Sequence, residues 1–175
     1  MHTDAHISPC GSYRYWLSRV WDESRPCGAW VMLNPSTADA TVDDPTIRRI
    51  MGFSQSWGWG GAKVFNLFAL RSPKPSALTE HSDPIGPEND RHLTGIACDL
   101  PVIAAWGQWG DHLDRARRVC AMFDEAGVKL QCLAVNNGGS PKHPLYVPGQ
   151  VRPVPYSLGP VTLSSKRGHP AAKEF

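Results

Sequence analysis

The sequence lacks several of the patterns by which a chain reveals its class. No apolar run approaches the roughly 20 residues that a membrane-spanning helix needs, and the first residues lack the features of a signal peptide. The glycine patterns G-x-G-x-x-G and G-x-x-x-x-G-K-[ST] are both absent. Their absence argues against a dinucleotide-binding Rossmann fold and against a P-loop nucleotide hydrolase. No segment repeats internally, and we expect no membrane partner.

Cysteine motifs are also absent. The five cysteines are scattered and odd in number, and none forms a C-x-x-C pair. This usage predicts reduced thiols and a cytoplasmic location. His2, His6, Cys10 and Cys27 have the residue types of a zinc site, but the first two lie at a chain end that usually frays. We therefore disfavour zinc, disfavour an iron–sulfur cluster further, and expect no cofactor.

The 175 residues fit one domain, and a formal net charge of +2 argues neither for nor against nucleic acid. Strand-like and helix-like segments alternate along the chain. This alternation predicts an α/β fold: a single three-layer domain with a central, mostly parallel sheet. The expected strands are 13–21, 29–33, 62–70, 101–107 and 128–135, and the expected helices are 45–57, 87–93 and 111–126.

The turn at 22–26 predicts an N-terminal β-hairpin of the strands 13–21 and 29–33. We expect residues 1–10 to be a flexible N-terminus, residues 11–148 to form the domain, and residues 149–175 to be a loosely held C-terminal tail.

A polar stretch follows the apolar run 29–33. The run stops at Asn34-Pro35, and a helix start follows with Asp44 as N-cap and Pro45 at the first helical position. This order predicts that Asn34, with the neighbouring Ser36 and Thr37, lies at the carboxyl edge of the sheet, where open α/β sheets bind ligands. An ordinary strand-to-helix connection explains the same residues without any chemistry.

Two further strands end in polar residues. Asn66 interrupts an almost continuously apolar strand, and a buried amide must either tie down backbone or face a ligand. Taken by itself, Asn66 favours the structural role. The loop 136–146 carries the pair Lys142-His143 at a strand end, for which we favour a functional role over a turn cap. We expect Asn34, Asn66 and His143 to converge on one cleft.

Six motifs carry a resemblance to a known family. They are Tyr13-Arg14-Tyr15, Leu33-Asn34-Pro35-Ser36-Thr37-Ala38, Asp44-Pro45-Thr46, Asn66-Leu67-Phe68, Trp106-Gly107 and Pro141-Lys142-His143-Pro144-Leu145-Tyr146. Through them residues 11–148 resemble an uncharacterised bacterial and phage family, the domain of unknown function numbered 1643. That family brings no established activity.

Three of the loops also resemble the uracil-DNA glycosylase superfamily, which has a first-strand Gly-x-Asp/Asn-Pro motif, a base-reading Asn and a late His-Pro loop. The resemblance implies that this fold is shared, that Asn34 holds the hydrolytic water, that Asn66 reads the base edge and that His143 stabilises charge on the departing base. It implies a metal-independent hydrolytic N-glycosidase acting on a base in DNA or in a nucleotide. Asn34 and His143 are then the catalytic candidates. The substrate-binding candidates are Pro35, Ser36, Thr37, Asn66, Phe68, Arg71, Trp106, Lys142, Leu145 and Tyr146.

The sequence departs from that superfamily in places. Met32-Leu33 replaces the glycine start, Leu145 replaces a serine after His-Pro, and the stacking aromatic has no aligned counterpart, with Phe68, Trp57 and Trp59 as candidates.

Two alternatives remain open. The first is a non-catalytic module of the same fold that binds nucleic acid or a nucleotide. The second is a Mg²⁺-dependent phosphohydrolase that uses Asp39, Asp43 and Asp44, although an N-cap explains Asp44 more simply. Five cations are either a phosphate-facing rim or solvated surface. They are Arg48, Arg49, Arg71, Lys74 and Lys142.

Overall fold

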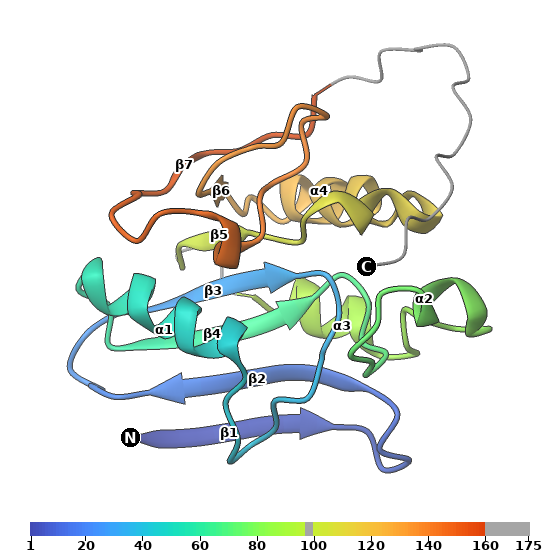
Figure 1. Ribbon diagram of the computed structural model, residues 1–175, viewed down its shortest axis with the longest axis horizontal. Coiled ribbons are helices and arrows are strands. Elements are labelled where there is room, and N and C mark those ends of the chain that lie inside the picture. Colours follow the sequence, from blue (N-terminus) through green and yellow to red (C-terminus); the bar gives the residue numbers. More distant parts are fainter. Residues whose placement is uncertain (97–99, 160–175) are drawn as a thin grey trace.

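A mixed seven-stranded sheet forms the centre of the computed structural model, which describes residues 1–96 and 100–159 (Figure 1). The order across the sheet is β1-β2-β4-β3-β5-β6-β7. The strands are β1 (His2–Ile7), β2 (Arg14–Val20), β3 (Cys27–Met32), β4 (Gly61–Asn66), β5 (Val102–Ala104), β6 (Leu130–Cys132) and β7 (Val154–Pro155).

The middle of the sheet is parallel and its margins are antiparallel. Strands β4, β3, β5 and β6 run in the same direction, whereas β1, β2 and β7 join by antiparallel pairing. Three of the six adjacent pairs are therefore parallel, so the expected mostly parallel sheet is corrected to a mixed one. The α/β class is confirmed.

The predicted hairpin of 13–21 with 29–33 is wrong. Strand β4 lies between β2 and β3, because the apolar β3 is buried on both faces and pairs with a parallel neighbour on each side. An N-terminal hairpin does exist, but it consists of β1 and β2. Within residues 1–10, for which a flexible segment was expected, β1 occupies His2–Ile7 as an edge strand.

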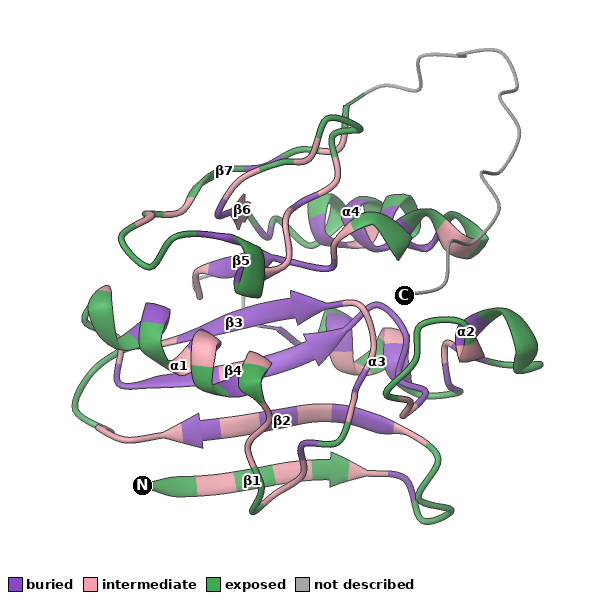
Figure 2. Cartoon of the chain, in the orientation of Figure 1, coloured by how far each residue is buried: buried purple, intermediate pink, exposed green. Residues whose placement is uncertain are grey.

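Helices cover both faces of the sheet (Figures 1 and 2). Alternate residues of β3 point to opposite faces: Trp30 and Met32 pack with α1 (Pro45–Ser56), whereas Ala29 and Val31 pack on the side of α3 (Asn89–Thr94) and α4 (Arg115–Glu125). The three-layer arrangement is thereby confirmed. The remaining short elements are α2 (Ala77–Glu80), η1 (Gln108–Asp114) and η2 (Pro144–Tyr146).

Two helix ends bear on the sequence predictions. Asp44 Oδ1 accepts a hydrogen bond from Ile47 N at 2.8 Å, which confirms Asp44 as the N-cap of α1. The helix expected over 111–126 is interrupted, because Leu113 and Asp114 both have φ of 54°. The regular helix α4 begins only at Arg115, and Leu113 is 59% exposed.

The described part of the expected C-terminal tail, residues 149–159, includes β7, which pairs with β6, and Tyr156, which is 8% exposed. Residues 160–175 lie outside the described part of the chain. Among the described helices, none combines the length and apolar character that crossing a membrane requires.

Candidate functional site

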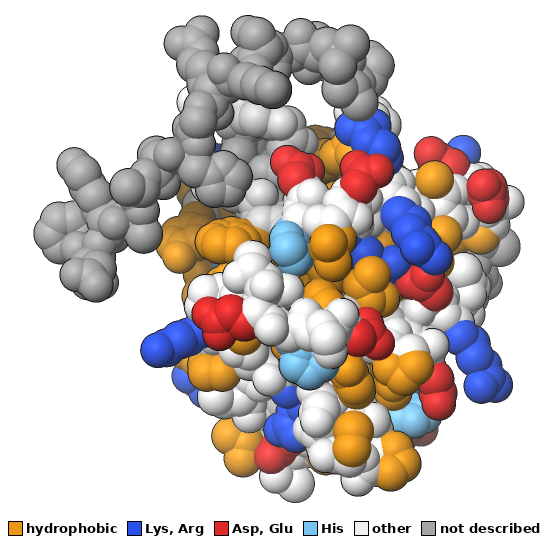
Figure 3. Space-filling view, turned by 90° about the vertical axis from the view of Figure 1, so that its right-hand side faces the viewer, with side chains coloured by type: hydrophobic (Ala, Val, Ile, Leu, Met, Phe, Trp, Pro, Cys, Tyr) orange, Lys and Arg blue, Asp and Glu red, His pale blue; other side chains and the backbone are white. Residues whose placement is uncertain are grey.

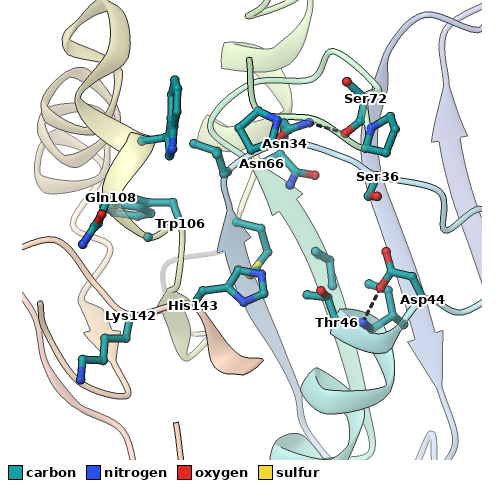
Figure 4. Close-up of a pocket in the computed structure, with 18 of the residues that line it drawn as sticks. Asn34, Ser36, Asp44, Thr46, Asn66, Ser72, Trp106, Gln108, Lys142 and His143 are labelled. Atoms are coloured by element: carbon teal, nitrogen blue, oxygen red, sulfur yellow. Dashed lines mark hydrogen bonds between the residues drawn. The ribbon is translucent and has the colours of Figure 1, made fainter. Parts of the chain in front are cut away.

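A pocket of about 530 Å³ lies at the carboxyl edge of the parallel strands (Figure 4). Its lining includes Met32 and Asn34 at the end of β3, Asn66 at the end of β4, and Trp106 after β5. From β3 the chain crosses to β4 on one side, and from β5 it crosses to β6 on the other. The pocket thus lies at the topological switch point, where open α/β sheets place their ligands.

The pocket unites most of the residues singled out from the sequence. Asn34, Asn66 and His143 all line it, as expected from the three strand ends. Of the other candidates, four line it too: Ser36, Trp106, Lys142 and Tyr146. Figure 4 shows Asn66 and His143 directed toward the enclosed space, whereas the chain of Lys142 extends away from it.

The Asn34 side chain is held by its nitrogen. Nδ2 donates to the carbonyl of Ser72 at 2.9 Å and to that of Pro35 at 3.1 Å. Ser72 N donates in turn to the Pro35 carbonyl at 2.8 Å. The amide therefore fastens the loop after β3 to the loop after β4, and its Oδ1 remains as a fixed acceptor.

Asn66 is the most buried polar residue of the lining, at 1% exposed. Its Oδ1 is buried and has no hydrogen-bond partner among the described residues. The backbone carbonyl of Asn66 is satisfied separately, by Asn89 Nδ2 at 3.1 Å. A buried amide oxygen without a partner costs free energy, which points to a ligand and away from the purely structural role.

The tautomer of His143 is set by its own loop. Nδ1 accepts from Leu145 N at 3.3 Å, where His143 caps η2. The ring proton therefore sits on Nε2, which is left to donate. Burial lowers the pKa of His143, and the charge of the Asp44 carboxylate offsets this only in part. The group is thus a neutral imidazole with one N–H donor at neutral pH.

The segment after β5 shapes the opposite wall. Trp106 is 2% exposed, and its buried Nε1 has no partner among the described residues. Gly107 follows with φ of 75°, a conformation that favours glycine and turns the chain toward His143. Gln108 and the exposed Trp109 continue the lining.

Five predicted substrate-binding residues lie outside the lining. Phe68 is fully buried in the core on the α3 and α4 side, and Pro35 is buried. Arg71 donates to the Gly11 carbonyl at 3.1 Å, which draws it away. Thr37 and Leu145 are exposed. Of the two other aromatic candidates, Trp57 and Trp59 pack around Trp30 on the α1 face rather than at this edge.

The three aspartates of the metal hypothesis do not share a site. Asp39 Oδ1 accepts from the backbone nitrogens of Thr41 and Val42, and Asp43 pairs with Arg19 Nε at 2.8 Å. Only Asp44 lines the pocket. Within residues 1–96 and 100–159, no group of three or more His, Cys, Asp or Glu side chains is arranged to hold a metal ion.

Sequence reasoning missed several lining residues. The most consequential is Arg14, which is 2% exposed and reaches the pocket from the start of β2. Arg14 was noted as part of the Tyr13-Arg14-Tyr15 motif, but the alternation of residues along the strand did not predict that its side chain is buried. The other missed polar residues, on four loops or helix starts, are Thr46, Ser72, Gln108 and Asn136.

A family model described as "Protein of unknown function (DUF1643)" matches residues 14–145. The chain belongs to this family. The match runs from β2 to η2 and therefore contains every lining residue of the pocket except Tyr146. Neither the curated proteins nor the solved structures contain a significant match to this DUF1643 chain.

Proposed function

We propose that this DUF1643 protein recognises a nucleobase and hydrolyses its N-glycosidic bond without a metal. The observation that carries the proposal is the placement of His143, whose Nδ1 is engaged by Leu145 N so that Nε2 is left to donate, in the same pocket as the unpartnered Oδ1 of Asn66. The resemblance to the uracil-DNA glycosylase superfamily supplies the roles, and the pocket supplies side chains with the matching chemistry.

The reaction places distinct demands on these groups. As the glycosidic bond breaks, the sugar becomes cationic and the base becomes anionic, so a donor aimed at a base oxygen lowers the barrier. A neutral imidazole gives such a donor without surrendering its proton. Asn34 Oδ1, fixed by the two bonds of its Nδ2, is suited to orient the attacking water.

Asn66 suits a base edge because an amide offers a donor and an acceptor side by side. Its burial makes the pairing selective: a base with the wrong edge leaves the amide unpaired, and that penalty is larger than the loss of an exposed contact. DNA or a nucleotide is accordingly the proposed partner.

The runner-up is a binding module with the same pocket and no catalysis. The hydrogen bonds of Asn34 favour this binding module, since two bonds to backbone carbonyls account for the presence of Asn34 without a role in activating water. A Mg²⁺-dependent phosphohydrolase is disfavoured, because Asp39 and Asp43 are engaged elsewhere.

The test is a mass-spectrometric screen for bases released from DNA and nucleotides that carry varied pyrimidines and purines. On the base that it identifies, His143→Ala should slow single-turnover cleavage by about 10²-fold, the scale for one oxyanion donor, with little change in binding. Asn66→Ala should weaken binding and blur selectivity. Release of no base, with His143→Ala altering affinity alone, would establish the binding module instead.

The role of the cations around the pocket and the independence from metal are tested separately. Lys142→Ala should weaken the binding of all substrates alike. Lys129→Ala should leave binding unchanged, because Lys129 precedes β6 at the opposite edge of the sheet from the pocket. Cleavage should survive EDTA. Loss on chelation, restored by Mg²⁺ and abolished by Asp43→Asn, would favour the phosphohydrolase.

A further inference from the structure

Three arginine side chains are almost completely buried, and they differ in what balances their charge. Arg14, Arg19 and Arg115 are 2%, 1% and 0% exposed. Arg19 lies 2.8 Å from the Asp43 carboxylate, and Arg115 lies 2.6 Å from that of Asp90. No carboxylate oxygen of the described residues lies within 4.0 Å of Arg14. Arg14 is also the one of the three that lines the pocket.

The hydrogen bonds of Arg14 are incomplete as well. Its Nη1 donates to the carbonyl of Ala38, in the loop that passes over the strand, but its buried Nε has no partner among the described residues. Burial lowers the pKa of Arg14 to about 10, and the negative charges of Asp44 and Asp39 offset this only in part. The guanidinium therefore keeps its positive charge at neutral pH.

An unpaired buried charge is unfavourable for a fold, and proteins rarely keep one without a purpose. The other charged groups of the lining are Lys142 at the edge and Asp44, whose Oδ1 is engaged by the backbone of α1. His143 is neutral. The lining thus has an excess of positive charge and a planar guanidinium with a free donor, which is the chemistry that recognises a phosphate.

We infer that the ligand is a nucleoside monophosphate, whose terminal phosphate binds Arg14 while its base pairs with Asn66. This inference rests on the proposed recognition of a nucleobase, and it selects a free nucleotide over a base within DNA.

Two observations favour the free nucleotide. A phosphodiester within a strand must leave the pocket in two directions, which a guanidinium that is 2% exposed does not accommodate. The face toward which β3 and β4 point also carries its Lys and Arg side chains scattered rather than in one stripe (Figure 3). Three of the five cations considered for a phosphate-facing rim donate instead to backbone carbonyls: Arg48 to Asp43, Arg49 to Val147 and Arg71 to Gly11.

The first experiment uses the wild-type protein alone. Calorimetric titrations compare inorganic phosphate, a panel of nucleoside 5′-monophosphates, the matching nucleosides, and a ten-residue single strand containing the same bases. We expect inorganic phosphate to bind, and the best monophosphate to bind at least about tenfold more tightly than its nucleoside, the scale of one charge-assisted hydrogen bond. A nucleoside that binds as tightly as its monophosphate, or a strand that binds more tightly than it, overturns the inference.

The second experiment assigns the phosphate to Arg14. Arg14→Gln should weaken binding of the monophosphate by about 10- to 100-fold and leave binding of the nucleoside unchanged. Arg14→Lys should have an intermediate effect, because lysine keeps the charge but lacks the planar guanidinium. Arg48→Gln is the matched control, since Arg48 is an exposed cation on α1 outside the lining. Equal losses in Arg14→Gln and Arg48→Gln overturn the assignment, and circular dichroism verifies that each variant is folded.

The results separate this inference from the proposed function. Monophosphates that bind through Arg14 without any release of base support the inference and refute the glycosidase. Base release from a strand, with monophosphates no tighter than nucleosides, refutes the inference and supports the glycosidase.

Discussion

Replacing Asn34 by aspartate tests the geometry of the site. A carboxylate is the stronger water-orienting group, and on chemistry alone the change should help. In the folded protein, however, Asn34 donates through Nδ2 to the carbonyls of Ser72 and Pro35, at 2.9 and 3.1 Å. Asn34→Asp puts a negative oxygen against those two acceptors. The substitution should therefore destabilise the loop after β3 instead of improving the orientation of the water.

The magnitude follows from the two lost bonds. Asn34→Ala removes both and should lower the free energy of unfolding by about 2 kcal/mol, at about 1 kcal/mol for each neutral hydrogen bond. Asn34→Asp adds repulsion between the carboxylate and the carbonyls, so we expect a total loss of about 3–4 kcal/mol at pH 7. Protonation relieves the repulsion, because a carboxylic acid donates one hydrogen bond. The introduced group then has a raised pKa when folded, and its penalty shrinks as the pH falls from 7 to 4.

Denaturant unfolding of both variants at pH 7 and pH 4 measures this. The control is Asn136→Asp, because Asn136 Nδ2 contacts the Ser140 hydroxyl at 3.1 Å, and a hydroxyl can reverse its role and donate to a carboxylate. Asn136→Asp should cost little at either pH. An Asn34→Asp protein as stable as the wild type at both pH values would refute the arrangement in which Nδ2 faces the two carbonyls.

Four other substitutions probe groups whose state the fold fixes. Because burial lowers the pKa of His143 below its unfolded value, folding stability should fall as the pH drops through about 6.5, and His143→Gln should remove part of that fall in denaturant titrations between pH 5 and 8. The part that remains should include His92, whose pKa is also lowered by burial. Without ligand, Arg14→Leu should leave the free energy of unfolding unchanged or raise it. Arg115→Leu should lower it by about 2 kcal/mol, because it removes the contact with the half-buried Asp90 and the hydrogen bond to the Leu67 carbonyl. Equal losses in the two variants would contradict the unpaired state of Arg14. Trp106→Phe removes a buried donor without a partner but also leaves a cavity in the core, so the two effects should roughly cancel in the free energy of unfolding, whereas ligand binding in calorimetry should weaken.

The central strands of the sheet could be predicted from the sequence because strands buried on both faces are apolar along their whole length. The apolar runs that became β3 and β4 are buried on both faces, and such strands leave continuous apolar sequence. The edge strand β1 leaves no such record: its residues alternate between exposed and half-buried, and they are mostly polar. The partner of β2 was mispredicted for another reason. Pairing with β4 spans about forty intervening residues, and local turn signals favour the nearer strand.

The site was predictable where a polar residue ends a buried strand. Asn34, Asn66 and His143 stand in such places, and the parallel direction of the strands brings them to one edge. The place of Arg14 in the pocket could not be predicted in this way, since a charged residue at the start of a strand is usually expected to face solvent. It is buried by the loop over the strand, which contacts it through the Ala38 carbonyl, and that contact is a tertiary one.

The polar groups of the pocket divide into two sets, and the division itself indicates what they are for. The fold satisfies Asn34 Nδ2, His143 Nδ1 and Asp44 Oδ1 with backbone partners, which fixes the direction of each side chain before any ligand arrives. The described fold leaves Asn66 Oδ1, Trp106 Nε1 and Arg14 Nε buried without partners.

A wall that served only to pack would have apolar residues at those three positions, because each unpaired group costs free energy in the empty protein. A ligand that accepts from Trp106 and Arg14 and donates to Asn66 recovers that cost. It also meets groups that are already oriented, so little further ordering is needed on binding. A nucleotide carries both kinds of group on one rigid base and adds an anion at its other end.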